Sequence, residues 1–174
     1  MKAITIIYTT GRMLAGCGSK ELDRGSALEL LKKEKDYPRM VEYDIFCADP
    51  AHARKLLDAG LEEKGLVTVQ RTQKLSDAGS PLISFTEAAK PYLLPTVEKD
   101  RKLDIQKVRL AEEVLQSVVS VQPSGEGKSG DVVYETAYTR LTPFSVLRTN
   151  PTDKKTHTAR FVLTGNGWQI EKRH

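Results

Sequence analysis

The chain has 174 residues, of which 39% are hydrophobic and 29% charged; this composition fits a folded globular protein and excludes a disordered tail. The formal net charge is +4, but the surplus of positive side chains is spread over two separate segments. Residues 1–19 carry two positive and no negative side chains, and residues 105–174 carry ten and seven. A nucleic-acid surface needs clustered cations, so we expect no nucleic-acid partner.

The N-terminal segment is the most informative part of the chain. Residues 1–16 contain a lysine, a mostly apolar run and two small residues, and Cys17 follows them directly. The sequence Leu14-Ala15-Gly16-Cys17 resembles the lipobox of bacterial lipoproteins. The resemblance implies that residues 1–16 are a signal peptide that is removed and that the Cys17 thiol is lipidated with diacylglycerol.

The lipobox resemblance also implies a location. Residues 17–25 then form a tether that holds the body at a membrane through the lipid on Cys17. Glycine rather than aspartate follows the cysteine, at position 18, and in this the sequence resembles lipoproteins that are sent to the outer membrane. We therefore expect a lipid-anchored protein of the bacterial cell envelope, on the outer membrane and facing the periplasm.

A different interpretation of the same segment stays open. Arg12 interrupts the apolar run, at a cost of about 2.5–3.5 kcal/mol in a membrane-inserted segment. Either the translation start lies elsewhere, or residues 3–9 form a first β-strand that ends at the turn Thr10-Gly11. The second interpretation predicts a protein that keeps Met1.

The next segment predicts a helix. Leucines and alanines recur at near-helical spacing among the charges of residues 20–36. Ser26 is the expected N-cap, with Glu29 three residues later in a capping-box pattern. Tyr37-Pro38 is expected to end the helix, because a residue before proline avoids the helical region.

A second helix and two strands are expected after a short extended piece. Asp49-Pro50 places an N-cap residue and a proline at the start of this helix. Strands follow at residues 65–69 and 82–85, and then a helical turn begins near Thr86. Residues 50–94 thereby resemble the helix-and-wing half of winged-helix domains.

The departures from the winged-helix pattern bear on what the resemblance implies. No middle helix is evident between Tyr37 and Asp49, and the expected recognition positions carry Asp58, Glu62 and Glu63 beside three basic residues. The resemblance therefore implies a packing or protein-binding module.

The last third of the chain predicts antiparallel β-structure. Residues 105–122 suit a long strand, although part of this segment also suits a helix, and residues 132–139 are rich in β-branched and aromatic side chains. Residues 158–171 form an expected hairpin, because Asn166-Gly167 is a strong turn signal. Trp168 and Ile170 should face a core.

Some motifs suggest chemistry but have simpler explanations. Gly125–Ser129 ends like a phosphate-binding loop, yet position 122 is glutamine rather than glycine, and a strand-like segment follows. Glu62-Glu63 and Glu112-Glu113 are interpreted as surface charges. Phe144 is expected in the core rather than at the floor of a pocket, and the same holds for Trp168.

A second group of residues lies close together in sequence: Asp44, Cys47, Asp49 and His52. A zinc site usually needs a second pair of ligands, and none is evident, so we expect no metal there. Cys47 is expected to be buried and inert. The sequence thus predicts no catalytic residue, no cofactor and no metal site, and lipidation of Cys17 is the single modification expected.

Together these features predict an α+β protein: a small helical, wing-like part at residues 26–95, then an antiparallel β-meander at residues 105–174. The expected function is a non-catalytic binding or structural role at the envelope, with the membrane and a protein or small ligand as partners. Two alternatives remain. One is a cytoplasmic winged-helix nucleic-acid-binding protein, and the other is a small enzyme whose site residues are dispersed in the sequence.

Overall fold

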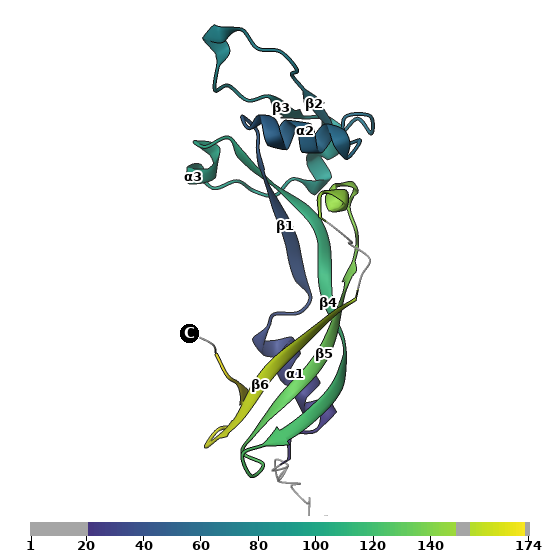
Figure 1. Ribbon diagram of the computed structural model, residues 1–174, viewed down its shortest axis with the longest axis vertical. Helices are drawn as coiled ribbons and strands as arrows, with labels where there is room; N and C mark the ends of the chain where they lie inside the picture. Colours follow the sequence, from purple (N-terminus) through teal and green to yellow (C-terminus); the bar gives the residue numbers. More distant parts are fainter. Residues whose placement is uncertain (1–20, 149–153, 173–174) are drawn as a thin grey trace, which may run out of the picture.

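Long antiparallel strands run from one end of the protein to the other in the computed structural model, which describes residues 21–148 and 154–172 (Figure 1). Helices make up 26% and strands 41%, so the predicted α+β class is confirmed. The helices are α1 (Arg24–Glu34), α2 (Pro50–Asp58) and α3 (Glu98–Arg101), with 3-10 helices η1 (Leu75–Asp77), η2 (Glu87–Tyr92) and η3 (Pro143–Leu147). The strands are β1 (Arg39–Phe46), β2 (Val67–Val69), β3 (Ile83–Phe85), β4 (Ile105–Ser124), β5 (Ser129–Thr139), β6 (Lys155–Thr164) and β7 (Gly167–Ile170).

The main sheet has the strand order β1-β4-β5-β6-β7, and every neighbouring pair is antiparallel. The first half of β4 pairs with β1, and the second half pairs with β5. Strands β4 to β7 follow one another in sequence and in space, which confirms the predicted meander. The segment 105–122, for which a helix was the alternative, is a strand.

Helix α1 begins differently from the sequence prediction. The Asp23 carboxylate, rather than Ser26, caps it and accepts a hydrogen bond of 2.8 Å from the backbone N–H of Ser26. The Ser26 hydroxyl donates to the same carboxylate at 3.1 Å. The prediction of Ser26 as N-cap is therefore wrong, because the carboxylate three residues earlier takes that position. In α2 the predicted cap is confirmed, since Asp49 accepts from the N–H of Ala51 at 2.8 Å.

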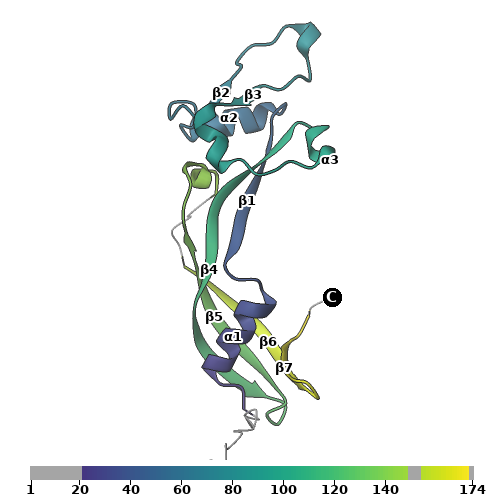
Figure 2. The ribbon, with the colours of Figure 1, turned by 180° about the vertical axis from the view of Figure 1, so that it is seen from behind.

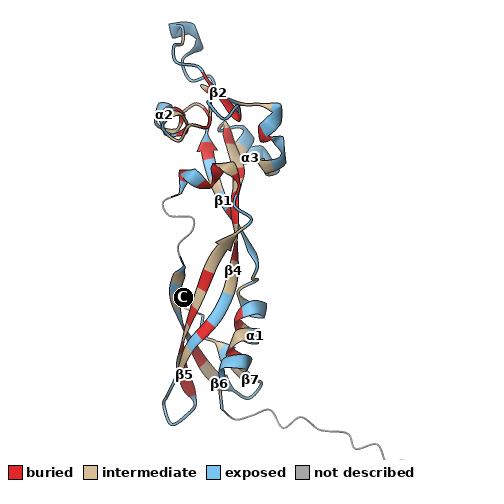
Figure 3. Cartoon of the chain, turned by 90° about the vertical axis from the view of Figure 1, so that its right-hand side faces the viewer, coloured by how far each residue is buried: buried red, intermediate tan, exposed pale blue. Residues whose placement is uncertain are grey.

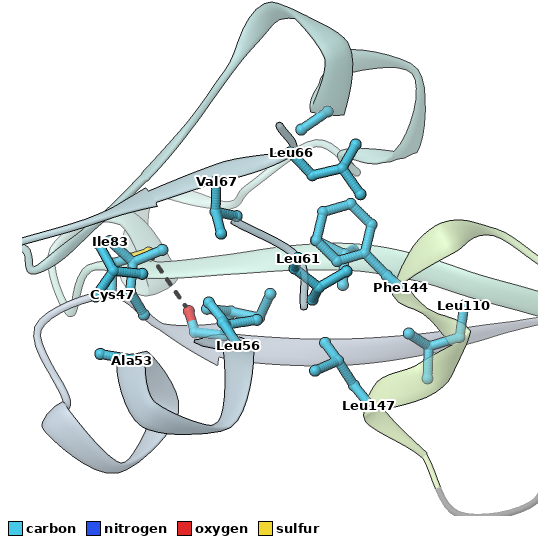
Figure 4. Packing of buried hydrophobic residues seen from close by; sticks show 14 of the residues in the cluster. Cys47, Ala53, Leu56, Leu61, Leu66, Val67, Ile83, Leu110, Phe144 and Leu147 are labelled. Atoms are coloured by element: carbon cyan, nitrogen blue, oxygen red, sulfur yellow. Dashed lines mark hydrogen bonds between the residues drawn. The ribbon is translucent and has the colours of Figure 1, made fainter. Parts of the chain in front are cut away.

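One hydrophobic cluster lies around α2, β2 and β3, where they pack on β1 and the first half of β4 (Figure 4). We call it the upper cluster. Phe144 of η3 is fully buried in it, as predicted, and its ring lies 6.2 Å from that of Phe85 and 6.1 Å from that of Tyr92. Helix η3 thereby ties the end of the β5 segment to the upper cluster.

A second hydrophobic cluster lies at the opposite end of the sheet, where α1 covers one face (Figure 2). We call it the lower cluster; its buried members are Ala27, Leu31, Val118, Val132, Tyr134, Ala159 and Phe161. Trp168 and Ile170 are half-buried against it, as the hairpin pattern predicted. The expectation that Trp168 belongs to the core rather than to a pocket holds only in part, because its side chain also lines a surface hollow. The hairpin itself is confirmed, but its turn lies one residue earlier than the predicted Asn166-Gly167: Thr164 pairs with Gly167, so the loop is Gly165-Asn166. Gly167 has a positive φ of 97° and begins β7.

Buried residues continue along β4 and β5 from one cluster toward the other (Figure 3). Strand β1 comes from the first part of the sequence and β4 from the last part, so both parts contribute to one sheet. Among the described residues, no helix is both long and apolar enough to cross a membrane.

Candidate functional site

The most unusual group in the fold is a buried carboxylate, Glu113, which is only 4% exposed. It lies on β4 opposite Arg39 of β1 on one side and Tyr138 of β5 on the other. The prediction of Glu112-Glu113 as two surface charges is therefore wrong for Glu113. Successive strand residues point to opposite faces, so Glu112 turns the other way and pairs with the exposed Arg140 at 3.0 Å.

Three side chains from three other strands converge on Glu113. Arg39 donates a hydrogen bond from Nε to Oε2 at 2.8 Å, and its Nη2 lies 2.7 Å from the same oxygen in an ion pair. The hydroxyl of Thr136 on β5 donates to Oε1 at 2.7 Å. His157 of β6 places Nε2 3.6 Å from Oε1 and 2.9 Å from the Thr136 oxygen. We call these four residues the Glu113 cluster.

The hydrogen-bond chain fixes the tautomer of His157. A threonine hydroxyl has one proton, and Thr136 gives it to the carboxylate. The contact between Thr136 and His157 is therefore a hydrogen bond only if the histidine donates, so its proton lies on Nε2.

Two tyrosines flank the cluster. The Tyr134 ring stacks on that of His157, with a centroid distance of 5.1 Å, and the guanidinium of Arg39 lies 5.1 Å from the ring centre of Tyr37. Burial raises the pKa of Tyr37, and the neighbouring Tyr134 raises it further, so its phenol stays neutral. The aromatic rings thus pack beside Arg39 and His157, whereas the Arg39 side chain itself remains 48% exposed.

Opposing effects set the charges within the cluster. Burial alone raises the pKa of Glu113, but the hydrogen bonds from Thr136 and Arg39 and the charge of Arg39 outweigh it, so this pKa is lower than usual. Burial lowers the pKa of His157; Glu113 opposes that shift, whereas Arg39, Lys155 and Lys35 reinforce it. At neutral pH the cluster therefore contains an ionised Glu113, a charged Arg39 and a neutral His157.

This arrangement is suited to holding strands together. Thr136 is 1% exposed and its proton is already donated, so its hydroxyl is not placed to attack a substrate. Glu113 has accepted hydrogen bonds on both oxygens. The Glu113 cluster links β1, β4, β5 and β6. It lies between the two hydrophobic clusters, because β4 supplies Ala111 to the upper cluster and Val118 to the lower cluster.

Cys17 and the rest of the predicted signal peptide and lipobox lie outside the described residues. The other cysteine, Cys47, is buried as predicted, and its thiol donates to the carbonyl of Ile45 at 3.7 Å (Figure 4). Burial raises the pKa of the Cys47 thiol, and the charge of Asp104 adds to this effect. The Cys47 sulfur is therefore held in its protonated, unreactive form.

The residues near Cys47 in sequence each have another partner. Asp49 caps α2, the ring Nδ1 of His52 accepts the N–H of Phe46 at 3.3 Å, and Asp44 lies 3.6 Å from the ammonium of Lys107. In residues 21–148 and 154–172, no group of three or more His, Cys, Asp or Glu side chains could hold a metal ion.

The glycine-rich segment Gly125–Ser129 forms the turn between β4 and β5, closed by a 3.0 Å bond from the N–H of Lys128 to the carbonyl of Gly125. A strand, β5, follows this turn. A phosphate-binding loop is followed by a helix, whereas here a strand follows the turn. The predicted connection between two strands is therefore confirmed.

Two surface hollows lie at the lower end. One, of about 240 Å³, lies between the start of α1 and the β4–β5 turn, with Leu22, Val121, Pro123, Gly127 and Trp168 in its lining. We call it the Trp168 groove. The other, of about 550 Å³, lies between the end of α1 and strands β6 and β7 and is lined largely by charged side chains.

Comparison of the chain with protein-family models, with curated proteins and with solved structures found no match.

Proposed function

We propose that this protein is a lipid-anchored protein of the bacterial envelope, attached through Cys17, with a non-catalytic binding or structural role. The observation that carries the proposal is the sequence Leu14-Ala15-Gly16-Cys17, placed directly before the folded body. Small residues before the cysteine suit a peptidase that must approach the backbone closely. Several acyl chains on such a cysteine give stable anchoring, which one chain alone does not.

The geometry of the body supports this proposal. Glu21, the first described residue, lies four positions after Cys17, and four extended residues span at most about 14 Å. The chain enters at the lower end, beside the start of α1, and the upper cluster lies at the opposite end (Figure 1). A lipid on Cys17 would therefore hold the lower end close to the bilayer and direct the upper cluster away from it.

The upper end offers surface for a partner protein. Leu75 is 94% exposed on the long connection between β2 and β3, which extends beyond the rest of the upper end (Figure 1). Val97 and Leu103, on either side of α3, are 62% and 57% exposed. We propose that a partner protein covers these apolar side chains.

Detergent-phase partitioning of the protein made in a bacterial host, combined with its intact mass, tests the proposal. We expect the wild type in the detergent phase with acyl mass on Cys17, and Cys17→Ser in the aqueous phase. Cys47→Ser is the matched control: because Cys47 is buried, this variant should partition like the wild type. An aqueous wild type that keeps Met1 would refute the proposal and favour the cytoplasmic alternative.

The nucleic-acid alternative has its own measurement. Several phosphate contacts would make DNA affinity fall steeply between roughly 50 and 200 mM salt. We expect no DNA binding even at low salt, because the charges of the body are mixed in sign.

A further inference from the structure

The Trp168 groove has an apolar lining at the end of the protein where the chain emerges. Leu22 precedes α1, Val121 and Pro123 end β4, and Trp168 comes from β7. The groove volume of about 240 Å³ accommodates roughly eight methylene-sized groups at ~30 Å³ each. It is therefore large enough for part of one alkyl chain.

Trp168 also carries an unpaired donor. Its indole Nε1 is buried and has no hydrogen-bond partner among the described residues. A buried donor without an acceptor is unfavourable, and it marks this region as one whose polar groups are incompletely satisfied. Tryptophan suits such a place, because it combines a large apolar ring with one N–H group.

The position of the groove indicates what could occupy it. Glu21 and Leu22 line it, and Cys17 is only four residues before Glu21. We propose that the Trp168 groove binds one acyl chain carried by Cys17, while the remaining chains anchor the protein in the bilayer. This inference rests on the proposed function, since it needs a lipid on Cys17.

The short tether makes weak binding sufficient. A ligand joined to its site by a short tether reaches an effective concentration on the order of millimolar there. An alkyl chain that binds the groove weakly when free would therefore occupy it when attached to Cys17. Binding of one chain would also hold the start of α1 at a fixed distance from the membrane.

Trp168 is the single tryptophan of the chain, so its fluorescence reports on the groove alone. The first experiment titrates the full-length Cys17→Ser protein, which lacks the lipid, with sodium decanoate below its micelle concentration. We expect a saturable shift of the emission to shorter wavelength. Leu22→Gln should weaken binding about tenfold, because part of a leucine side chain loses its apolar contact with the ligand.

Leu28→Gln is the matched control. Leu28 is also half-buried against the lower cluster, but it does not line the groove, so this variant should bind decanoate like its parent. No saturable shift, or equal weakening by Leu22→Gln and Leu28→Gln, would overturn the inference. Because the titration uses unlipidated protein, its result is independent of whether Cys17 is acylated in the cell.

A second measurement uses the lipidated protein in vesicles. Acrylamide should quench Trp168 severalfold less in the wild type than in Cys17→Ser under the same conditions, and Leu22→Gln should restore the quenching. Equal quenching of a wild type whose mass shows the lipid would overturn the inference while leaving the proposed anchoring intact.

Discussion

Glu113→Gln tests the physical account of the Glu113 cluster most directly. The change keeps the size of the side chain but removes the charge that pairs with the Arg39 guanidinium and accepts a hydrogen bond from it and another from Thr136. Breaking one partner of a fully buried ion pair costs about 3–5 kcal/mol. Here the Arg39 side chain is 48% exposed, and water partly replaces its lost partner, so we expect a loss of about 2–4 kcal/mol.

The assay is urea unfolding followed by circular dichroism, with the midpoint and slope measured for each variant. The expected loss corresponds to a lowering of the melting temperature by about 10 °C. Glu112→Gln is the matched control on the adjacent residue. Its partner Arg140 is 76% exposed, so water screens this ion pair and the variant should change stability by less than about 1 kcal/mol.

The pH dependence of stability adds a second readout. The pKa values of Glu113 and His157 are both lowered in the folded state, so the unfolded chain binds protons more readily and acid destabilises the fold. Stability should fall as the pH drops below the ordinary histidine value of 6.5, and again below the ordinary glutamate value of 4.5. Glu113→Gln should reduce the second fall, and what remains comes from Asp23 and Glu62, whose pKa values are also lowered in the folded state. A variant as stable as the wild type, with both falls intact, would refute the reasoning.

Three further changes test other parts of the fold. Phe144→Ala should lower the free energy of unfolding in urea by about 3–5 kcal/mol, because it leaves a cavity in the upper cluster. Val146 is 46% exposed on the same 3-10 helix, so Val146→Ala should cost under about 0.5 kcal/mol. Equal losses for the two variants would contradict this packing. Asp23→Ala should lower the melting temperature through the lost N-cap, and an unchanged thermal transition would contradict that role. In the Cys17→Ser protein, Cys47 should react with a thiol reagent much more slowly in the folded state than in urea, because burial raises its pKa; equal rates would show an exposed thiol.

The elements that the sequence predicted correctly depend on local signals. The start of α2 depends on Asp49-Pro50, whose carboxylate and fixed backbone angle act within one turn. The β6–β7 hairpin depends on glycine and asparagine at its turn, between strands that alternate apolar and polar residues. Helix α1 shows where such signals become ambiguous: Asp23 and Ser26 can both cap a helix, and the capping-box pattern favours the wrong one of the two.

Glu113 could not be located from local sequence, because its partners are distant. Arg39 is 74 residues away and Thr136 is 23 residues away, and only the pairing of β1 and β5 with β4 brings them together. One signal was available. In a strand, one of two adjacent glutamates must face inward if the other faces outward, so the assignment of residues 105–122 to a strand implied that one carboxylate would need a buried partner.

The position of the Glu113 cluster explains why a charged group is retained inside a sheet. Strand β4 supplies buried residues to both hydrophobic clusters, but between Ala111 and Val118 the one buried residue of this strand is Glu113. Two register shifts, at Leu115/Ser117 and Val118/Ser120, lie next to this stretch. Hydrogen bonds to a buried carboxylate are directional, so they fix the relative positions of four strands where apolar packing is sparse. If the lower end is held at a membrane and the upper end binds a partner, this cluster keeps the two ends in a constant orientation.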